Sequence, residues 1–221
     1  MYQQQLLTKA PEVVARLNEV LPLADRYAGL DPSQIQLYSH IMNQLLSTGT
    51  AIAQTDLASR THTDLSAVPA LLQSLADMDL IVVDARGAQV IGAYPLTTAN
   101  TPHQLTLGRV KLRAMCAFDA LALSPITGQP VQISSCCAVT GTKISLYQQG
   151  DQFGQISPAP PLVGIGWQTT NGCAAHSLCR DMVFLQHGDA ARQWAQGKSV
   201  SVMELDQAVV AASTFFGPLF P

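Results

Sequence analysis

Apolar side chains recur at helical spacing along the first part of the chain. Between Pro11 and Tyr27 this periodicity predicts a single helix, which begins with a proline suited to a first helical turn and which Gly29 ends. Asp31 is a favourable N-cap residue, and the apolar positions after it predict a second helix that continues to Gly49. The chain therefore opens with two amphipathic helices in succession.

Two further helical segments and a hairpin follow. The pattern predicts a short helix over residues 54–60, a longer helix that Thr63 or Asp64 caps, and strands over residues 81–84 and 89–93 with a turn at Arg86-Gly87. Helix, short helix, helix and hairpin is the element order of a winged helix-turn-helix. We therefore predict a helical, winged helix-like domain over residues 1–94.

The pattern changes after Pro95, where short apolar runs separated by turn residues replace the helical periodicity. Such runs are typical of strands, and they predict strands over residues 104–107, 131–134, 143–147, 162–167 and 182–185. Helices are expected over residues 118–123, 190–196 and 203–215. This mixture predicts a second, β-rich domain over residues 95–221 and an α+β fold class for the whole chain.

The composition is that of a globular protein with few charges. Of the 221 residues 48% are hydrophobic and only 12% are charged, with a net charge of −3. The charged fraction is about half of the roughly 25% typical of soluble domains, but the hydrophobic content excludes a disordered chain. No apolar run reaches the roughly 18 residues of a membrane span, and the first residues do not resemble a secretory signal. We therefore expect a cytoplasmic protein with reduced cysteines and no membrane partner.

The local charge argues against nucleic-acid binding by the predicted winged helix. Between Asp31 and Ala93 two arginines stand against six aspartates, which leaves a local net charge of −4. A domain that neutralises phosphates gains most of its affinity from lysine and arginine. We therefore expect no nucleic-acid partner and interpret this segment as a structural or docking module.

The cysteines all lie in the second half of the chain, at Cys116, Cys136, Cys137, Cys173 and Cys179. Asp119 follows Cys116 at a spacing that places a thiol and a carboxylate on one face of a helical turn. Such a pair combines a soft metal ligand or nucleophile with a proton carrier. A position at the start of a helix would favour the thiolate of Cys116. The alternative interpretation is that each cysteine is a small apolar residue buried in the core, without a chemical role.

Other candidate chemistry is sparse. Three basic residues alternate just before Cys116 and are expected to add positive potential there, namely Arg109, Lys111 and Arg113. The histidines are scattered without a pair at helical ligand spacing, which argues against a zinc site, and His103 is expected to make a structural hydrogen bond. The sequence contains no phosphate loop, dinucleotide fingerprint or Cys-x-x-Cys motif.

Four sequence blocks resemble those of a known family. They are Thr101-Pro102-His103-Gln104-Leu105, Cys116-Ala117-Phe118-Asp119-Ala120-Leu121, Ser134-Ser135-Cys136-Cys137-Ala138-Val139-Thr140-Gly141 and Ser177-Leu178-Cys179. In this order they resemble the blocks of the organomercurial lyase (alkylmercury lyase) family, whose winged helix-like N-terminal segment is also similar. The resemblance covers roughly residues 31–215.

The resemblance implies a catalytic site and a reaction. By this resemblance the catalytic residues are Cys116, Asp119 and Cys179. The two thiols are the ligands of mercury, and Asp119 is a proton carrier and a further ligand. Cys137 corresponds to a structural cysteine. Mercury is a soft cation that prefers thiolate ligands. The implied activity is cleavage of a carbon–mercury bond by protonolysis, without an organic cofactor. The implied partners are an organomercurial substrate and, for the Hg(II) product, a mercuric reductase or small thiols.

Some residues depart from the family pattern and leave alternatives open. Cys136 stands before Cys137, charged residues follow Cys179 directly, and Cys173 is an additional thiol. We expect Cys136 to be buried. The alternative function is a non-catalytic thiol protein that binds soft metals, including a metal-responsive regulator. A thiol redox protein is disfavoured by the lack of a Cys-x-x-Cys motif.

Overall fold

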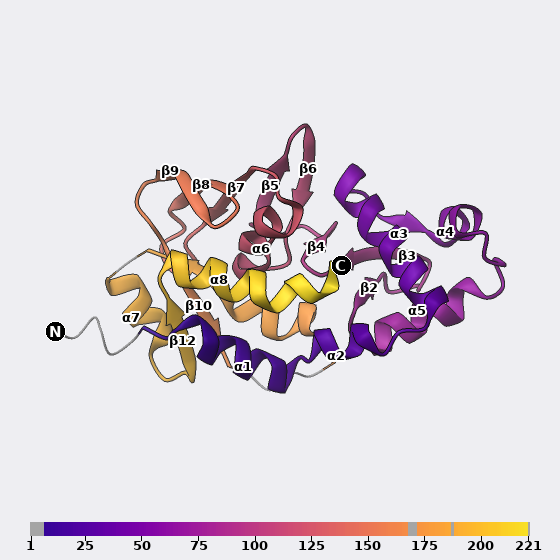
Figure 1. The fold of residues 1–221 in the computed structure, drawn as a ribbon. Helices are drawn as coiled ribbons and strands as arrows, with labels where there is room; N and C mark the ends of the chain where they lie inside the picture. Colours follow the sequence, from indigo (N-terminus) through magenta and orange to yellow (C-terminus); the bar gives the residue numbers. More distant parts are fainter. Residues whose placement is uncertain (1–6, 168–171, 187, 221) are drawn as a thin grey trace.

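The computed structural model describes residues 7–167, 172–186 and 188–220, and it combines helices with antiparallel sheets (Figure 1). The predicted α+β fold class is confirmed. Residues 32–93 form the part of the molecule at the right of Figure 1, and the cysteine-bearing half forms most of the remainder. The predicted boundary at residue 94, the winged-helix assignment and the cytoplasmic location stay predictions.

The first helical region is interrupted, which corrects the prediction of a single helix. It consists of α1 (Ala10–Val20) and α2 (Leu23–Ala28), which are separated at Leu21 and Pro22. A residue before proline is disfavoured in the α conformation, and Leu21 has φ −146° and ψ 76°. The apolar periodicity runs through this break and therefore concealed it.

The next helices agree largely with the predicted pattern. They are α3 (Pro32–Thr48), α4 (Gln54–Thr61) and α5 (Val68–Asp77). Asp31 caps α3 in a reciprocal arrangement with Gln34, and Gly49 ends it in the left-handed conformation with φ 65°. The start of α5 was predicted too early, because Asp64 accepts a hydrogen bond from Ser66 N (2.9 Å) in a turn that precedes the helix.

The predicted hairpin is present in a small sheet. Its strands are β1 (Ile52–Ala53), β2 (Ile81–Val83), β3 (Gln89–Ala93) and β4 (Leu96–Thr97), and all pairings are antiparallel. β3 lies between β1 and β2 and also pairs with β4. This sheet follows α5 directly and leads the chain into the cysteine-bearing half.

Two further sheets form the cysteine-bearing half. One has the order β6-β5-β7-β8-β9, and its strands are β5 (Gln104–Leu107), β6 (Val110–Arg113), β7 (Val131–Cys136), β8 (Lys143–Gln149) and β9 (Gln152–Ser157). The other has the order β11-β10-β12, with β10 (Leu162–Gly166), β11 (Met182–Leu185) and β12 (Val200–Met203). The five predicted strands are present. β6, β9 and β12 were not predicted, although the residues of β6 (Val110–Arg113) alternate between apolar and polar as in a half-buried strand.

The helices of this half lie between and beside the sheets. They are α6 (Ala117–Thr127), α7 (Asp189–Ala195) and α8 (Leu205–Phe216), with 3-10 turns η1 (Ala174–His176), η2 (Leu178–Asp181) and η3 (Gly217–Leu219). Every residue of α6 from Ala117 to Ser124 is buried, and all of them except Asp119 and Ser124 are apolar, as expected for a helix that is covered on all sides. Phe118 of α6 contacts Phe215 and Phe216 of α8.

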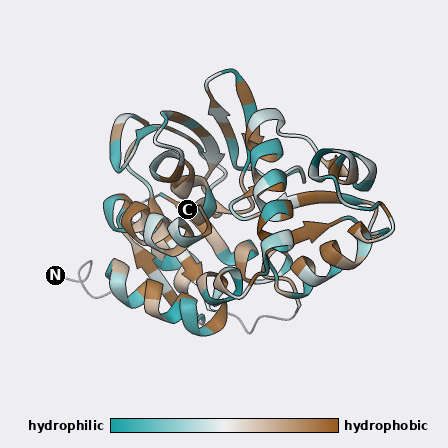
Figure 2. Ribbon diagram, turned by 45° about the vertical axis from the view of Figure 1, so that its right-hand side comes forward, coloured by the Kyte–Doolittle hydropathy of each residue, from teal (hydrophilic) through white to brown (hydrophobic). Residues whose placement is uncertain are grey.

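The beginning and the end of the chain pack together. α1 lies along α8 (Figure 1), and Thr8 N donates a hydrogen bond of 2.7 Å to Val202 O of β12. In the hydropathy view, hydrophobic residues are frequent on the strands, and the helices carry hydrophobic and hydrophilic residues in turn along their length (Figure 2). None of the helices in the described parts of the chain is long and apolar enough to cross a membrane. Cys116 is fully buried in the interior of the protein, with 0% of its surface exposed.

Candidate active site

Cys116 lies where an extended segment enters α6. With φ −147° and ψ 178° it has the extended conformation of an N-cap residue, and its Sγ accepts a hydrogen bond from Asp119 N (3.3 Å). Sulfur replaces the oxygen of the usual serine or aspartate cap. The predicted pairing of Cys116 with Asp119 on the first helical turn is therefore present.

Cys179 comes from a distant part of the sequence. It lies in η2, directly before β11, and both its side chain and that of Cys116 are buried. The Cys116 thiol donates a hydrogen bond to the Sδ of Met182, the first residue of β11 (3.6 Å). Cys116 therefore contacts the segment that follows Cys179.

The three residues singled out from the sequence converge in the structure. Two thiol sulfurs and one carboxylate oxygen, from Cys116, Cys179 and Asp119, lie within 4.8 Å of one another, and all three side chains are buried. Neither carboxylate oxygen of Asp119 has a hydrogen-bond partner among the described residues. Two soft sulfur ligands beside a carboxylate can hold a soft cation and supply or remove a proton.

Burial controls the protonation of this cluster. It raises the pKa of the Asp119 carboxyl to about 7, and the neighbouring Cys116 lowers this pKa by a smaller amount. Burial also raises the pKa of Cys116 well above its usual value, with further contributions from Cys179 and Asp119. The adjacent Cys116 thiol lowers the pKa of Cys179, but burial and the nearby carboxylates outweigh this effect, so that the pKa of Cys179 is raised as well. Both thiols therefore carry protons at neutral pH.

One electrostatic expectation is corrected by this arrangement. Cys116 does begin a helix, but the helix dipole does not make it a thiolate, because desolvation in the interior is the larger effect. The positive potential expected from the basic residues upstream stays a prediction. Lys111 and Arg113 line a groove at β6, and the pKa of Cys116 is raised by burial first and then by Cys179 and Asp119.

Comparison with known proteins agrees with this geometry. The family model for MerB, alkylmercury lyase, matches residues 96–217, which is more than half of the chain and includes all three clustered residues. The chain belongs to the alkylmercury lyase family. The expectation that it is an enzyme of this family is thereby confirmed.

Alignments with individual relatives extend over most of this chain. An alkylmercury lyase from Bacillus cereus is 28% identical over 199 residues, which are 88% of this chain and 87% of the relative. One from Streptomyces lividans is 28% identical over 160 residues, or 72% of each chain. A solved structure, the mercury-bound form of MerB2, has a TM-score of 0.75 at 22% identity and covers 90% of this chain and 98% of its own. This last likeness establishes a shared fold.

The other thiols of this alkylmercury lyase family member lie outside the cluster. Cys137 is buried, and its Sγ accepts a hydrogen bond from Gln186 N (3.3 Å), which agrees with a structural position. Cys136 is half-buried rather than buried, because the two-residue alternation of β7 directs it to the same side as the exposed Ser134. Cys173 is also half-buried, and burial together with Asp79 raises its pKa to about 12.

His103 makes the structural hydrogen bond that its sequence context predicts. Its Nδ1 forms a buried hydrogen bond of 2.9 Å with Ser135 Oγ, and its ring lies against Phe184. Burial lowers the His103 pKa to about 4, so that the ring is neutral at physiological pH. It therefore joins β5 and β7 without entering the cysteine cluster.

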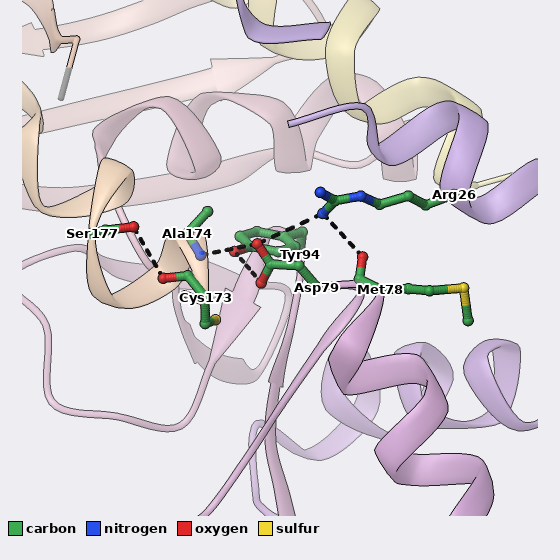
Figure 3. A network of polar contacts seen from close by, with 7 residues as sticks. All are labelled: Arg26, Met78, Asp79, Tyr94, Cys173, Ala174 and Ser177. Carbon is green, nitrogen blue, oxygen red and sulfur yellow. Dashed lines mark hydrogen bonds and ion pairs between the residues drawn. The ribbon is translucent and has the colours of Figure 1, made fainter. Parts of the chain in front are cut away.

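Sequence reasoning missed a polar network next to the cluster. Asp79 is buried and contacts Tyr94, Ala174 and Arg26, which come from separate regions of the chain (Figure 3). No periodicity or motif marks Asp79, since it stands alone in the short connection between α5 and β2. Only the tertiary arrangement reveals its partners.

Proposed function

We propose that this protein cleaves the carbon–mercury bond of organomercurials by protonolysis and releases a hydrocarbon and Hg(II). The observation that carries this proposal is the buried convergence of Cys116, Cys179 and Asp119 within 4.8 Å in a member of the alkylmercury lyase family. The cluster combines two soft ligands with a proton carrier, which are the two requirements of the reaction. Relatives that are named alkylmercury lyases support the same substrate class.

The first step is capture of the substrate by Cys116. The organomercurial arrives with mercury bonded to one carbon and to one small thiolate. Cys116 sulfur forms a bond to mercury, the bond to the small thiolate breaks, and the thiol proton of Cys116 leaves with the displaced thiolate. Since burial keeps Cys116 protonated in the free protein, the thiol is preserved until mercury replaces its proton.

The second step adds Cys179 and loads the proton carrier. Cys179 sulfur bonds to mercury while its proton passes to the Asp119 carboxylate. A second thiolate raises the electron density on mercury and weakens the bond to carbon. Asp119 is suited to this transfer because its pKa of about 7 allows the group both to accept and to donate a proton near neutral pH.

The last step is protonolysis. Asp119 gives its proton to the carbon, the electron pair of the carbon–mercury bond forms the new carbon–hydrogen bond, and the hydrocarbon leaves. Mercury stays on Cys116 and Cys179 as a dithiolate, and the carboxylate is restored. The sequence of steps needs no oxidant, reductant or organic cofactor.

The surroundings of the reaction follow from the same chemistry. Small cytoplasmic thiols or the thiols of a mercuric reductase would remove Hg(II) from the two cysteines by ligand exchange.

The acidic N-terminal region serves as a structural or docking module with a winged-helix arrangement and does not bind nucleic acid, since its net charge between residues 31 and 93 is −4. A cytoplasmic location keeps all five thiols reduced.

The second candidate function is soft-metal binding without catalysis. The cluster of two thiols would hold Hg(II) in either case, but a binding protein has no need of a buried carboxylate beside the thiols. The burial of an unpartnered Asp119 carboxylate therefore favours the lyase.

The decisive experiment measures free arene released from an arylmercurial in the presence of excess small thiol. Cys116→Ser, Cys179→Ser and Asp119→Ala are each expected to lower the release rate at least about 100-fold, since each removes a group that acts in the transition state. Cys136→Ser is the matched control, because it removes a thiol that lies outside the cluster. This variant should retain the wild-type rate.

Two results would contradict the proposal. Wild-type arene release by Cys179→Ser would exclude a two-thiol mechanism. A wild-type protein that binds Hg(II) through the cluster but releases no arene would establish the non-catalytic candidate instead.

A further inference from the structure

Asp79 occupies an unusual position for an acidic residue. It follows α5 with a left-handed φ of 55°, and only 8% of its surface is exposed. Its Oδ1 accepts a hydrogen bond from the Tyr94 hydroxyl (3.3 Å), and its Oδ2 accepts one from Ala174 N (2.9 Å), as Figure 3 shows. A buried carboxylate is costly unless it is paired and hydrogen-bonded, so these partners define its role.

Arg26 provides the opposite charge. Its Nη1 lies 3.8 Å from Asp79 Oδ2 and also donates a hydrogen bond of 3.1 Å to Met78 O, the carbonyl adjacent to Asp79. The guanidinium is thus held beside the carboxylate by the backbone as well as by charge. The Asp79 carboxylate therefore has a cation beside it, and charged acceptors make the stronger hydrogen bonds to N–H donors.

The bond to Ala174 reaches the segment that carries Cys179. Ala174 is the first residue of η1, and η1 packs against η2, which contains Cys179. Within the segment, Ser177 Oγ donates to Cys173 O (3.1 Å) and Arg180 N donates to Ser177 O (3.1 Å). The two short turns therefore form a connected unit, and Asp79 joins the start of this unit to the end of α5.

We propose that Asp79 is a positioning residue for Cys179. By accepting the hydrogen bond from Ala174 N, it holds η1 and η2 where Cys179 reaches Cys116 and Asp119. This inference rests on the proposed function, in which Cys179 is the second ligand of mercury. Asp79 is not one of the three clustered residues, which are Cys116, Asp119 and Cys179.

The test measures the affinity of the protein for Hg(II) in competition with a small dithiol, because tight binding requires both thiols in place. Asp79→Gly removes the carboxylate without steric strain, since glycine adopts a positive φ freely. We expect the affinity to fall about tenfold or more, as the loss of a charge-assisted hydrogen bond to Ala174 N allows η1 to shift. Asp79→Asn keeps an oxygen that can accept the hydrogen bond from Ala174 N, so this variant should retain most of the wild-type affinity for Hg(II).

A second variant removes the donor instead of the acceptor. Ala174→Pro lacks the N–H group, proline is tolerated at the first position of a helical turn, and Cys173 already has the extended conformation that precedes proline, with φ −64° and ψ 129°. It should weaken Hg(II) binding as Asp79→Gly does. His62→Gly is the matched control, because His62 is exposed and has a similar positive φ of 53°, and its affinity should equal that of the wild type.

A double-mutant cycle with Cys179→Ser separates positioning from a general effect on structure. If Asp79 acts through Cys179, Asp79→Gly will not weaken Hg(II) binding further in the Cys179→Ser background. The inference is overturned if Asp79→Gly binds Hg(II) like the wild type, or if it causes equal losses in both backgrounds. If Cys179→Ser alone leaves the affinity unchanged, the proposed function fails, which is a distinguishable result.

Discussion

Asp119→Asn is expected to stabilise the folded protein at and above neutral pH, because it removes an ionisable carboxyl from a fully buried position. Asp119 has 0% exposure. Burial raises its pKa from 3.8 to about 7. At about 1.36 kcal/mol for each pKa unit, ionising this carboxyl in the folded protein costs about 4 kcal/mol relative to the unfolded chain. Asparagine has nearly the same size and does not carry this cost.

The direction of the pH dependence follows from the number of bound protons. The unfolded chain loses the Asp119 proton near pH 3.8, whereas the folded protein keeps it until about pH 7. Between these values the folded state binds more protons, so the free energy of unfolding falls as the pH rises, and above about pH 7 the loss is complete. The variant lacks this contribution. Its advantage over the wild type is therefore expected to grow by about 4 kcal/mol between about pH 4 and pH 8.

Urea unfolding of both proteins, without mercury and under reducing conditions, measures this difference. Groups common to both proteins contribute equally and cancel, among them His103, whose pKa burial lowers to about 4. Cys116 and Cys179 contribute little in this range, because their raised pKa values keep both thiols protonated. Parallel pH profiles for the two proteins would refute the reasoning that burial keeps Asp119 protonated up to neutral pH.

Two further predictions concern packing and hydrogen bonding in the cysteine-bearing half. Gly164→Ala would place a Cβ 2.5 Å from a ring carbon of Trp194 and 2.8 Å from Leu185 Cδ1, and overpacking of this kind costs about 1–3 kcal/mol, which a lower urea midpoint would reveal. A wild-type midpoint would show that Trp194 moves aside without cost. Ser135→Ala leaves the buried Nδ1 of His103 without its hydroxyl partner and should lower the free energy of unfolding by about 1–3 kcal/mol. Equal stability of this variant and the wild type would contradict a structural role for the His103 hydrogen bond.

Much of the fold could be predicted from local sequence because neighbouring residues determine it. Asp31 and Gly49 mark the ends of α3 through capping and left-handed geometry, which depend on a few adjacent residues. Strands such as β5 and β11 were predicted with their observed bounds. β6, β9 and β12 were missed, since their stability comes from the strands that pair with them rather than from their own pattern.

Local sequence was enough to place one half of the candidate site, but it only indicated the other half. The spacing of Cys116 and Asp119 places both at the first turn of α6 because a helix is a local structure, whereas Cys179 was singled out through the resemblance of its block to a family. Only the tertiary structure decided that Cys179 joins them and that Asp79 lies beside its segment, because these contacts join regions far apart in the chain. It also decided the protonation of the thiols. Desolvation depends on every group packed around a side chain, so burial outweighs the local helix dipole that the sequence suggested.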